Sequence, residues 1–457
     1  MKYVIAILFI LLSFKSLAYE LAKNIDLSNV PAASVIKVSE NKFVLLEYNF
    51  FRQPLISIGS AVLNSKCQVN KILCSKLLLG SKTNSLFLKL NSSNRPTVHT
   101  IRYELDGLSK EIQLQILPDD FPIYKVDGKS LLQDDLVFSL FPLRGEKSSW
   151  VSFLLVLDHH GNVLFTRKLQ GIAADFKRHK ISNETFYSYL DVEQSFERVT
   201  MVGQRILLNS NFEIIKKLPE KQDLHEFLLQ DLNSYIYFTY GLSRSVVGTY
   251  YIDQKIEQVR DGKKVFSFGI DDLVLQKYYA SNVLKMMFQD QLAIHQYHLN
   301  SLQVVDDNRW LVSLGFDSVF MLNPKTKKIE WVFGGVNDQF GITNEMAMNL
   351  HHTPFFDSQD DTLTVFDNGF TTRRSRVLSF HLDFKNKKIK KFIPLHDQGF
   401  FTLMMGGVEK KSDIYSISFG SKDIGSYDFI EQKEATKTMG LSFTSPGYGI
   451  YRIYRSK

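Results

Sequence analysis

The clearest pattern of apolar and polar positions along the chain lies between residues 298 and 335. Four short runs rich in β-branched and aromatic residues alternate there with breaks that carry Asp, Asn or Pro. Strand-forming runs separated by turn residues predict an up-and-down antiparallel sheet. A four-stranded sheet of this length is typical of one blade of a β-propeller.

The same unit recurs at two other places in the chain. It begins again at His352 and, more loosely, at His225. Weaker strand patterns indicate two blades before His225 and one after residue 400, and that last blade is expected to use the C-terminal run 448–456. A repeat of this kind predicts a six-bladed propeller over residues 119–457. Residues 271–292 lack turn signals, which predicts a helical or loop excursion between blades three and four.

Three histidines occupy equivalent positions in this repeat. The first strand of each blade of a propeller lines the central channel, and His225, His298 and His352 each begin such a strand. A single histidine at a strand start is usually a solvated loop residue, but three at one phase of a repeat favour a shared axial site. Asn300 lies two residues after His298 and therefore faces the same side of its strand.

The N-terminal region reads as a signal peptide followed by a separate domain. Residues 1–18 combine Lys2, the apolar run 3–14 and small residues at 16 and 18, as in a cleaved secretory signal. Residues 19–118 contain short alternating strands, which predict a small N-terminal β-sandwich-like domain. The mature chain is expected to be periplasmic or secreted, without a stable membrane span; a retained N-terminal anchor is the alternative.

Composition narrows the choice of partners. The formal net charge is +7, and loss of Lys2 and Lys15 with the signal would leave a mild +5. The lysines are scattered among turns, so the pattern predicts no nucleic-acid partner. The two cysteines, Cys67 and Cys74, are expected to form a disulfide in an exported protein, contributing roughly 2–2.5 kcal/mol; two free thiols are the alternative. Their spacing, without a neighbouring histidine cluster, predicts no metal site.

Several of these motifs together resemble a known family. The run 298–335, LHHTPFF (350–356), LTVFDNG (363–369) and SRVLSF (375–380) are similar to the bacterial arylsulfotransferases, which are nucleotide-independent aryl-sulfate sulfotransferases of the periplasm. The likeness is ordered over 298–383 and fainter at 155–165 and 223–227. It implies a small N-terminal β domain before a six-bladed propeller, no cofactor, and a small-molecule aryl sulfate and phenol as partners.

The resemblance also implies roles for particular residues. It makes His298 and His352 catalytic, together with an arginine that follows the Asp-Asn-Gly motif. That arginine is taken as Arg374, with Arg373 and Arg376 as the competing positions. Substrate binding then falls to four residues: His225, Asn300, Arg373 and Arg376. These residue types suit sulfuryl transfer, because arginine offers forked donors to two oxygens and histidine can act as nucleophile or as acid.

One departure from the family pattern concerns the nucleophile. The resemblance places it in the last blade, whereas no histidine follows His396 in this sequence. Three outcomes follow: another histidine is the nucleophile, transfer is direct between donor and acceptor, or the site is inactive. The sequence therefore predicts an exported arylsulfotransferase. Its alternative is a non-catalytic propeller that binds an anionic ligand or scaffolds partners. The oligomeric state, a homodimer included, is left open.

Overall fold

The computed structural model divides the chain into two compact units, residues 1–121 with 162–167, and residues 122–161 with 168–457. It describes the strands between residues 22 and 117, Pro118, and residues 120–455 apart from 144–149, 197–199, 279–283, 289–290, 397–400, 421–426, 435 and 444–447. The expected signal peptide, residues 1–18, lies outside these ranges. Among the described residues, no helix is both long and apolar enough to cross a membrane.

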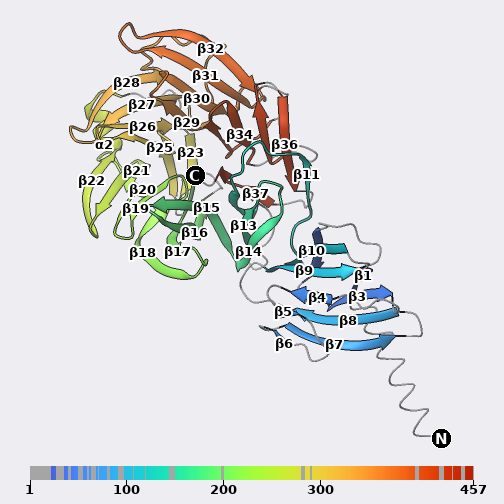
Figure 1. Cartoon of the computed structure of the whole chain (residues 1–457). Helices are drawn as coiled ribbons and strands as arrows, with labels where there is room; N and C mark the ends of the chain where they lie inside the picture. Colours follow the sequence, from blue (N-terminus) through green and yellow to red (C-terminus); the bar gives the residue numbers. More distant parts are fainter. Residues whose placement is uncertain are drawn as a thin grey trace, which may run out of the picture. The chain divides into compact units, whose positions relative to one another are not determined.

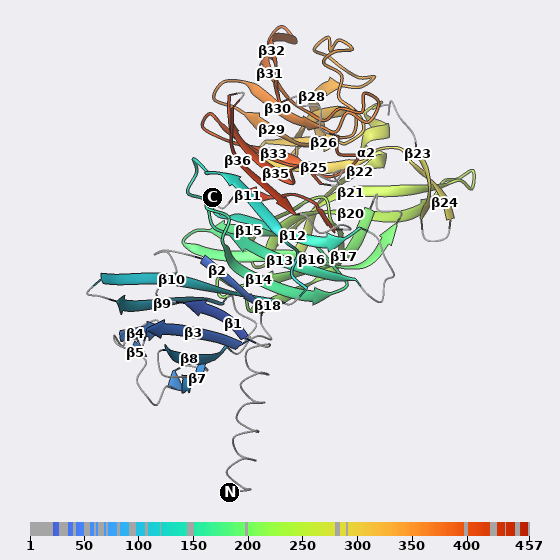
Figure 2. The same ribbon diagram turned by 90° about the vertical axis from the view of Figure 1, so that its right-hand side faces the viewer.

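The first unit contains two five-stranded sheets, as the alternating strands of residues 19–118 predict (Figures 1 and 2). One sheet has the order β1-β3-β8-β7-β6 and the other the order β2-β10-β9-β4-β5. The strands are β1 (Ala22–Asp26), β2 (Val35–Ser39), β3 (Phe43–Asn49), β4 (Leu55–Ile58), β5 (Ala61–Val62), β6 (Gln68–Val69), β7 (Ile72–Leu79), β8 (Thr83–Leu90), β9 (Thr97–Leu105) and β10 (Leu108–Leu117). Cys67 lies outside the described residues and the side chain of Cys74 is not described, so the disulfide stays a prediction.

The strands between residues 124 and 455 form a six-bladed β-propeller, which confirms the predicted fold class. Its blades follow one another around a ring in sequence order, from green through yellow to red (Figure 1). Blades two, four and five are simple four-stranded meanders, because each apolar run is followed by a tight polar turn. Their strands are β15 (Ile172–Ile181), β16 (Glu184–Phe196), β17 (Thr200–Leu208), β18 (Ile214–Asp223), β25 (Leu299–Asp306), β26 (Arg309–Leu314), β27 (Ser318–Asn323), β28 (Lys328–Gly334), β29 (His351–Asp357), β30 (Thr362–Asp367), β31 (Arg376–Asp383) and β32 (Lys388–His396).

Blade three carries the excursion expected between residues 271 and 292. Its meander is followed by a short helix and then by a hairpin that joins the same sheet through Tyr251 and Ile294 (Figure 2). The expected helix is confirmed at the start of the segment, whereas its later described residues form a hairpin and not a loop. The elements are β19 (Phe227–Asp231), β20 (Ser234–Arg244), β21 (Tyr250–Arg260), β22 (Lys263–Gly269), α2 (Ile270–Leu275), β23 (Leu284–Phe288) and β24 (Gln291–His295).

Both ends of the propeller segment close the ring, and here the prediction for the C-terminal run is wrong. That run was expected in the last blade, but it pairs with the first blade, while β11 from the start of the propeller joins the last blade. Exchange of end strands satisfies backbone groups that would otherwise face an open edge. Blade one contains β12 (Leu136–Pro142), β13 (Val151–Leu157), β14 (Val163–Gln170), β37 (Tyr448–Ile450) and β38 (Tyr454–Arg455). Blade six contains β33 (Gly407–Lys411), β34 (Ile414–Ser418), β35 (Phe429–Lys433), β36 (Thr436–Phe443) and β11 (Tyr124–Gly128).

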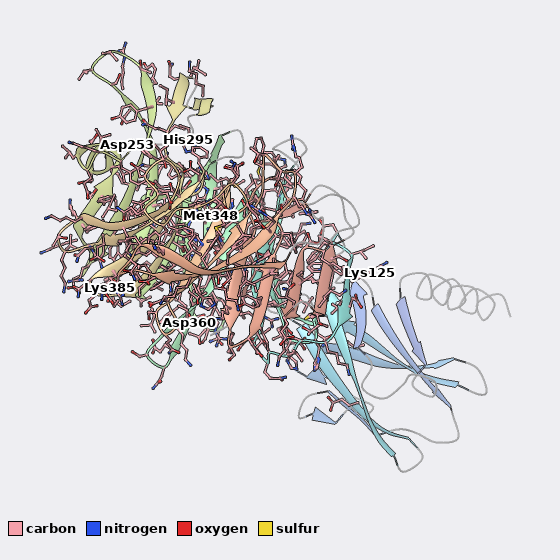
Figure 3. All side chains as sticks on the ribbon, turned by 90° about the horizontal axis from the view of Figure 1, so that it is seen from above. Lys125, Asp253, His295, Met348, Asp360 and Lys385 are labelled. Atoms are coloured by element: carbon pink, nitrogen blue, oxygen red, sulfur yellow. The ribbon has the colours of Figure 1, made fainter. Side chains whose placement is uncertain are left out.

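Apolar side chains fill the space between neighbouring blades. Between blades four and five, Trp331, Phe333, Phe356 and Phe380 are buried in one cluster with mostly edge-on ring contacts. Full burial of such a side chain stabilises the fold by about 1.5–3 kcal/mol. Polar turn residues lie at the outside of the blades, Lys385 among them (Figure 3). This packing makes the ring a stiff frame for the residues at its centre.

Candidate active site

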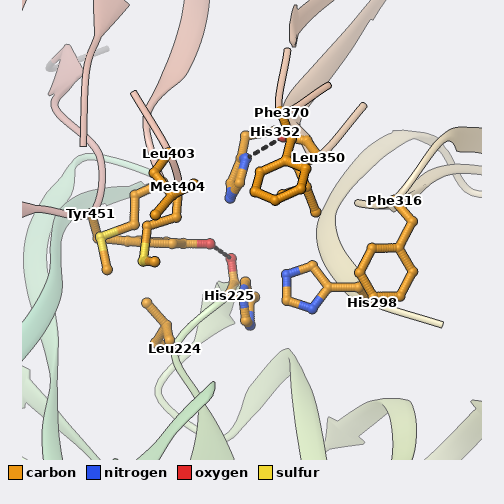
Figure 4. Close-up of a pocket in the computed structure, with 11 residues that line it drawn as sticks. Leu224, His225, His298, Phe316, Leu350, His352, Phe370, Leu403, Met404 and Tyr451 are labelled. Atoms are coloured by element: carbon orange, nitrogen blue, oxygen red, sulfur yellow. Dashed lines mark hydrogen bonds between the residues drawn. The ribbon is translucent and has the colours of Figure 1, made fainter. Parts of the chain in front are cut away.

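The inner ends of the blades enclose a cavity of about 190 Å³. It combines a group of imidazoles with a wall of apolar and aromatic side chains (Figure 4). The lining residues are Leu224, His225, His298, Phe316, Leu350, His352, Phe370, Leu403, Met404, Met405 and Tyr451. The structure therefore brings His225, His298 and His352 together from blades three, four and five.

His225 sits in the connection between β18 and β19 and is paired with a buried carboxylate. Its Nδ1 is hydrogen-bonded to Oδ1 of Asp223, which also accepts a 2.9 Å bond from the backbone N–H of His225. Since an ionised carboxylate only accepts, Nδ1 carries a proton and Nε2 is the nitrogen left for exchange with a ligand. The pair has the arrangement of a general acid–base group with an orienting carboxylate.

His298 precedes β25 and lies against the ring of His225, with the two centroids 4.7 Å apart. Its Nδ1 is 3.3 Å from Nε2 of a further buried histidine, His295, and its ring stacks on Phe316. Burial, and then repulsion from neighbouring imidazoles, holds the pKa of His298 well below its usual value. His298 is therefore neutral at neutral pH.

His352, on β29, has its tautomer fixed by Asn368. Nδ1 of His352 is 2.6 Å from Oδ1 of Asn368. The amide nitrogen of Asn368 donates 3.0 Å bonds to the carbonyl oxygens of Thr402 and Met405, so its oxygen must face the imidazole. Nδ1 of His352 is consequently the donor, and Nε2 keeps an unprotonated lone pair.

Electrostatics keeps that lone pair free. Burial lowers the pKa of His352 well below its usual value, and the nearby charge of Arg452 lowers it further. The hydrogen bond that His352 donates to Asn368 raises this pKa and so acts in the opposite direction. A neutral imidazole with one free nitrogen can attack an electrophile without first losing a proton.

Arg452 is a buried cation of the site that the sequence prediction missed. It lies between β37 and β38 and donates to Oε2 of Glu226 at 3.3 Å, and to the carbonyl and side-chain oxygens of Asn300 at 3.0 and 3.2 Å. Nε of Arg452 and Nδ2 of Asn300 are both buried without a partner among the described residues. Two orphaned donors and a positive charge close to the imidazoles form a region that favours an anion.

A larger ion network supports Arg452. Lys177 lies 2.8 Å from Glu226 and 3.3 Å from Asp175, and Arg205 lies 2.9 Å from Asp175. Three cations therefore face two carboxylates in this buried group. The network therefore carries one positive charge in excess of its carboxylates. Arg452 is the member of the network whose charge acts on His352.

None of the three arginines predicted for the site lies in the cavity wall. Arg376 makes a buried 2.6 Å ion pair with Asp367 and donates to the carbonyl oxygens of Glu345 and Ala347. Arg373 and Arg374 are exposed, and none of the three lines the cavity. A turn closes after Gly369, where the backbone N–H of Arg374 bonds the carbonyl oxygen of Gly369, so closeness in sequence to the Asp-Asn-Gly motif does not place a side chain in the cavity wall.

As far as the structure describes them, Asn300 and the last blade contribute no polar side chain to the cavity wall. Asn300 is fully buried and is held by Arg452 behind His298 rather than in the cavity wall. The last blade contributes no imidazole to the cavity; its connections supply Leu403, Met404 and Met405 instead. In the part of the chain that the structure describes, no group of three His, Cys, Asp or Glu side chains is arranged to hold a metal ion.

The fold and cavity define a β-propeller with a histidine-lined pocket at the inner ends of its blades. Residues 223–428, somewhat less than half of the chain, match the family model described as arylsulfotransferase (ASST). The match confirms the resemblance to arylsulfotransferases over this segment, which includes all three cavity histidines. No curated protein matches the chain.

Several solved structures are similar to the chain at low scores. They include the WD40 β-propeller domain of Doa1, with 10% identity, 80% of this chain and 88% of that chain covered, and a TM-score of 0.34. BamB from Moraxella catarrhalis has 10% identity, coverage of 66% and 83%, and a TM-score of 0.28. AztD from Citrobacter koseri has 12% identity, coverage of 70% and 99%, and a TM-score of 0.31. Scores this low carry no argument about function.

Proposed function

We propose that this protein transfers a sulfuryl group from an aryl sulfate to a phenol in the histidine cavity, with His352 as the nucleophile. The observation that carries the proposal is the fixed tautomer of His352, whose Nδ1 is held by Asn368 while Nε2 stays unprotonated. The match of residues 223–428 to the arylsulfotransferase family model supports sulfuryl transfer as the class of reaction.

In the first step, Nε2 of His352 attacks sulfur and the bond from sulfur to the aryl oxygen breaks. The departing phenolate takes a proton from Nε2 of His225, so the proposed step starts from a doubly protonated imidazole, which Asp223 faces at Nδ1. The sulfated imidazole of His352 gains positive charge, and the Oδ1 atom of Asn368 stabilises it by accepting from Nδ1. The residual positive charge around Arg452 favours the sulfuryl oxygens throughout.

In the second step, the acceptor phenol returns a proton to Nε2 of His225 while its oxygen attacks sulfur. The bond between sulfur and Nε2 of His352 then breaks, which restores the resting enzyme. A dry apolar cavity of about 150 Å³ holds one benzene ring. With about 190 Å³, this cavity suits one aryl group at a time, so donor and acceptor should bind in turn.

The test uses purified protein, 4-nitrophenyl sulfate and a phenol acceptor, with nitrophenolate release as the readout. Rapid-quench trapping with radiolabelled donor alone should give an acid-labile label on the protein. His352→Ala should lose label and turnover, and His298→Ala should lose most turnover. Label that persists in His352→Ala but disappears in His298→Ala would make His298 the nucleophile. Normal turnover without label would favour direct transfer.

Folded protein that releases no nitrophenolate with several phenols would support the alternative function, a non-catalytic propeller that binds an anionic ligand. Calorimetric titration with 4-nitrophenyl sulfate would then measure binding directly. A site that neither binds nor turns over the sulfate ester would rule out both functions.

We further propose that the chain is exported, on the signal-like pattern of residues 1–18, and that Cys67 and Cys74 pair in the mature protein. Mass spectrometry of the mature N-terminus and thiol titration of the unfolded, unreduced protein are the measurements. An N-terminus at Met1 would contradict the first proposal, and two free thiols would contradict the second.

A further inference from the structure

An exposed arginine, Arg373, lies beside a partly exposed residue of the cavity wall. Phe370 lines the cavity and is 41% exposed, which places it at the mouth (Figure 4). The guanidinium carbon of Arg373 lies 5.3 Å from the ring centroid of Phe370 and 5.2 Å from that of Phe401. Arg373 is exposed and makes no ion pair with any residue that the structure describes.

The two loops that carry this cluster are tied together. The hydroxyl of Ser375 donates to the carbonyl oxygen of Asn368 at 2.9 Å and accepts a 2.9 Å bond from the backbone N–H of Thr402. The same Asn368 orients His352 and donates to the carbonyl oxygens of Thr402 and Met405. The position of the mouth residues is therefore coupled to the position of the candidate nucleophile.

The backbone of Arg373 is also held in an unusual conformation. Its φ is +55°, in the left-handed region that residues with a Cβ rarely adopt. The preceding turn is closed by Thr372, whose hydroxyl donates to the carbonyl oxygen of Gly369 at 3.1 Å. A left-handed non-glycine residue costs about 1–2 kcal/mol, so the surrounding bonds must hold it there.

These observations limit what Arg373 can recognise. Contact with two phenyl rings anchors the guanidinium and leaves N–H donors at its edge for a planar anion that accepts two bonds. A phenol whose reacting oxygen lies at the imidazoles, and whose ring lies against Phe316, Leu350 and Met404, would direct its opposite end toward the mouth.

We infer that Arg373 selects phenol acceptors that carry a carboxylate opposite the hydroxyl, so that small phenolic acids are the preferred acceptor class. This inference rests on the proposed function, because it takes the imidazoles as the place of sulfuryl transfer. It assigns Arg373 to acceptor specificity and not to the chemical step. A neutral phenol of the same size should react without help from Arg373.

The experiment compares 4-hydroxybenzoate with its methyl ester at saturating 4-nitrophenyl sulfate. In the wild type, kcat/KM for the acid should exceed that for the ester. Arg373→Gln should lower kcat/KM for the acid by roughly tenfold, in line with the loss of a charge-assisted hydrogen bond, and leave the ester unchanged. Arg260→Gln, which removes an exposed charge at the end of β21, is the matched control and should change neither value.

Equal losses for acid and ester, or no loss for either, would overturn the inference while leaving the proposed function intact. If the protein turns over no sulfate ester at all, calorimetric binding of the two acceptors to wild type and Arg373→Gln still decides the point. Tighter binding of the acid that disappears in Arg373→Gln supports recognition by Arg373. Equal binding of acid and ester contradicts it.

Discussion

Oδ1 of Asn368 lies 2.6 Å from Nδ1 of His352, and the amide that carries this oxygen is fixed by two backbone carbonyl groups. The relationship joins β29 to the end of β30, so two adjacent strands of one blade set the protonation pattern of one imidazole. Under the proposed function, Asn368 is a positioning residue that acts through His352 and not on the substrate.

Removal of this bond should slow the reaction without moving the nucleophile far. We expect Asn368→Ala to lower kcat by about 10²-fold, because one oriented polar partner of the transition state is lost. Asn368→Asp keeps an acceptor but adds a negative charge, which should raise the pKa of His352 and move the acidic limb of the kcat/KM profile upward. Ser375→Ala loosens the same loops without touching His352; an identical pH profile in all three variants would argue against the role.

Gly315 gives a steric test of His298. A Cβ added at Gly315 would lie 2.7 Å from Cδ2 of His298, so Gly315→Ala must displace the imidazole. Misplacement by about 1 Å can cost up to 10²-fold in rate, and we expect a loss of at least tenfold in kcat/KM with 4-nitrophenyl sulfate. Gly241→Ala is the control, since its Cβ would meet nothing within 4 Å. Unchanged kinetics in Gly315→Ala would remove His298 from the reaction.

Arg452 should matter for both stability and anion binding. Arg452→Gln leaves Glu226 buried with Lys177 as its remaining cation, and we expect the free energy of unfolding to fall by about 3 kcal/mol. Glu226→Gln added to it should recover part of that stability but not the affinity for inorganic sulfate. The measurements are chemical unfolding and inhibition by sulfate. Full recovery of both in the double variant would make Arg452 purely structural.

The buried histidines predict a fall in stability with acid. Burial lowers the pKa of His295 and of His351 to about 3 and lowers those of His298 and His352 well below normal. Below pH ~6.5 the unfolded chain binds protons that the folded chain does not, so the free energy of unfolding decreases as pH falls, by up to about 1.4 kcal/mol per pH unit for each imidazole. His351→Gln should reduce the slope of this decline by up to about 1.4 kcal/mol per pH unit between about pH 6 and 4. An unchanged slope would contradict a lowered pKa for His351.

Asp367 should prove structural, although it is next to the residue that orients the nucleophile. Its carboxylate pairs with Arg376 and accepts backbone bonds from Asn349 at 2.7 Å and Gly369 at 3.1 Å. Asp367→Asn is expected to lower the free energy of unfolding by about 2–3 kcal/mol, the range for hydrogen bonds to a charged group. Turnover by the folded variant should stay within a few-fold of wild type, whereas a loss above 10²-fold would give Asp367 a part in the reaction.

The blade repeat and the meeting of three histidines follow from local signals in the sequence. Alternating strands and polar turns determine each blade, and the phase of His225, His298 and His352 within the repeat places them at the channel. Arg452 carries no such signal, because its place depends on which blade the C-terminal strand joins. The C-terminal strand could close the ring by pairing with the first blade or with the last. Residues 448–455 alone do not show which, because the choice depends on the strands of the whole ring.

The positions of the arginines after Gly369 show a second limit. A turn that includes the left-handed Arg373 sends neighbouring side chains in different directions: Arg376 to Asp367, Arg373 to two phenyl rings. Spacing along the chain predicts a face only where the backbone is regular. The function of the Asp-Asn-Gly motif therefore lies in Asp367 and Asn368, which end a regular strand, rather than in the arginines beyond it.

Closure of the ring by β37 and β38 has a consequence for when the site can exist. Tyr451 donates to the backbone oxygen of His225 and Arg452 to that of Asn300, and both lie where β37 and β38 pair with β12, some three hundred residues earlier in the sequence. A growing chain on the ribosome that has not yet made β37 has the three imidazoles but neither Tyr451 nor Arg452. The cavity wall is therefore complete only once β37 and β38 have been made and have paired with β12.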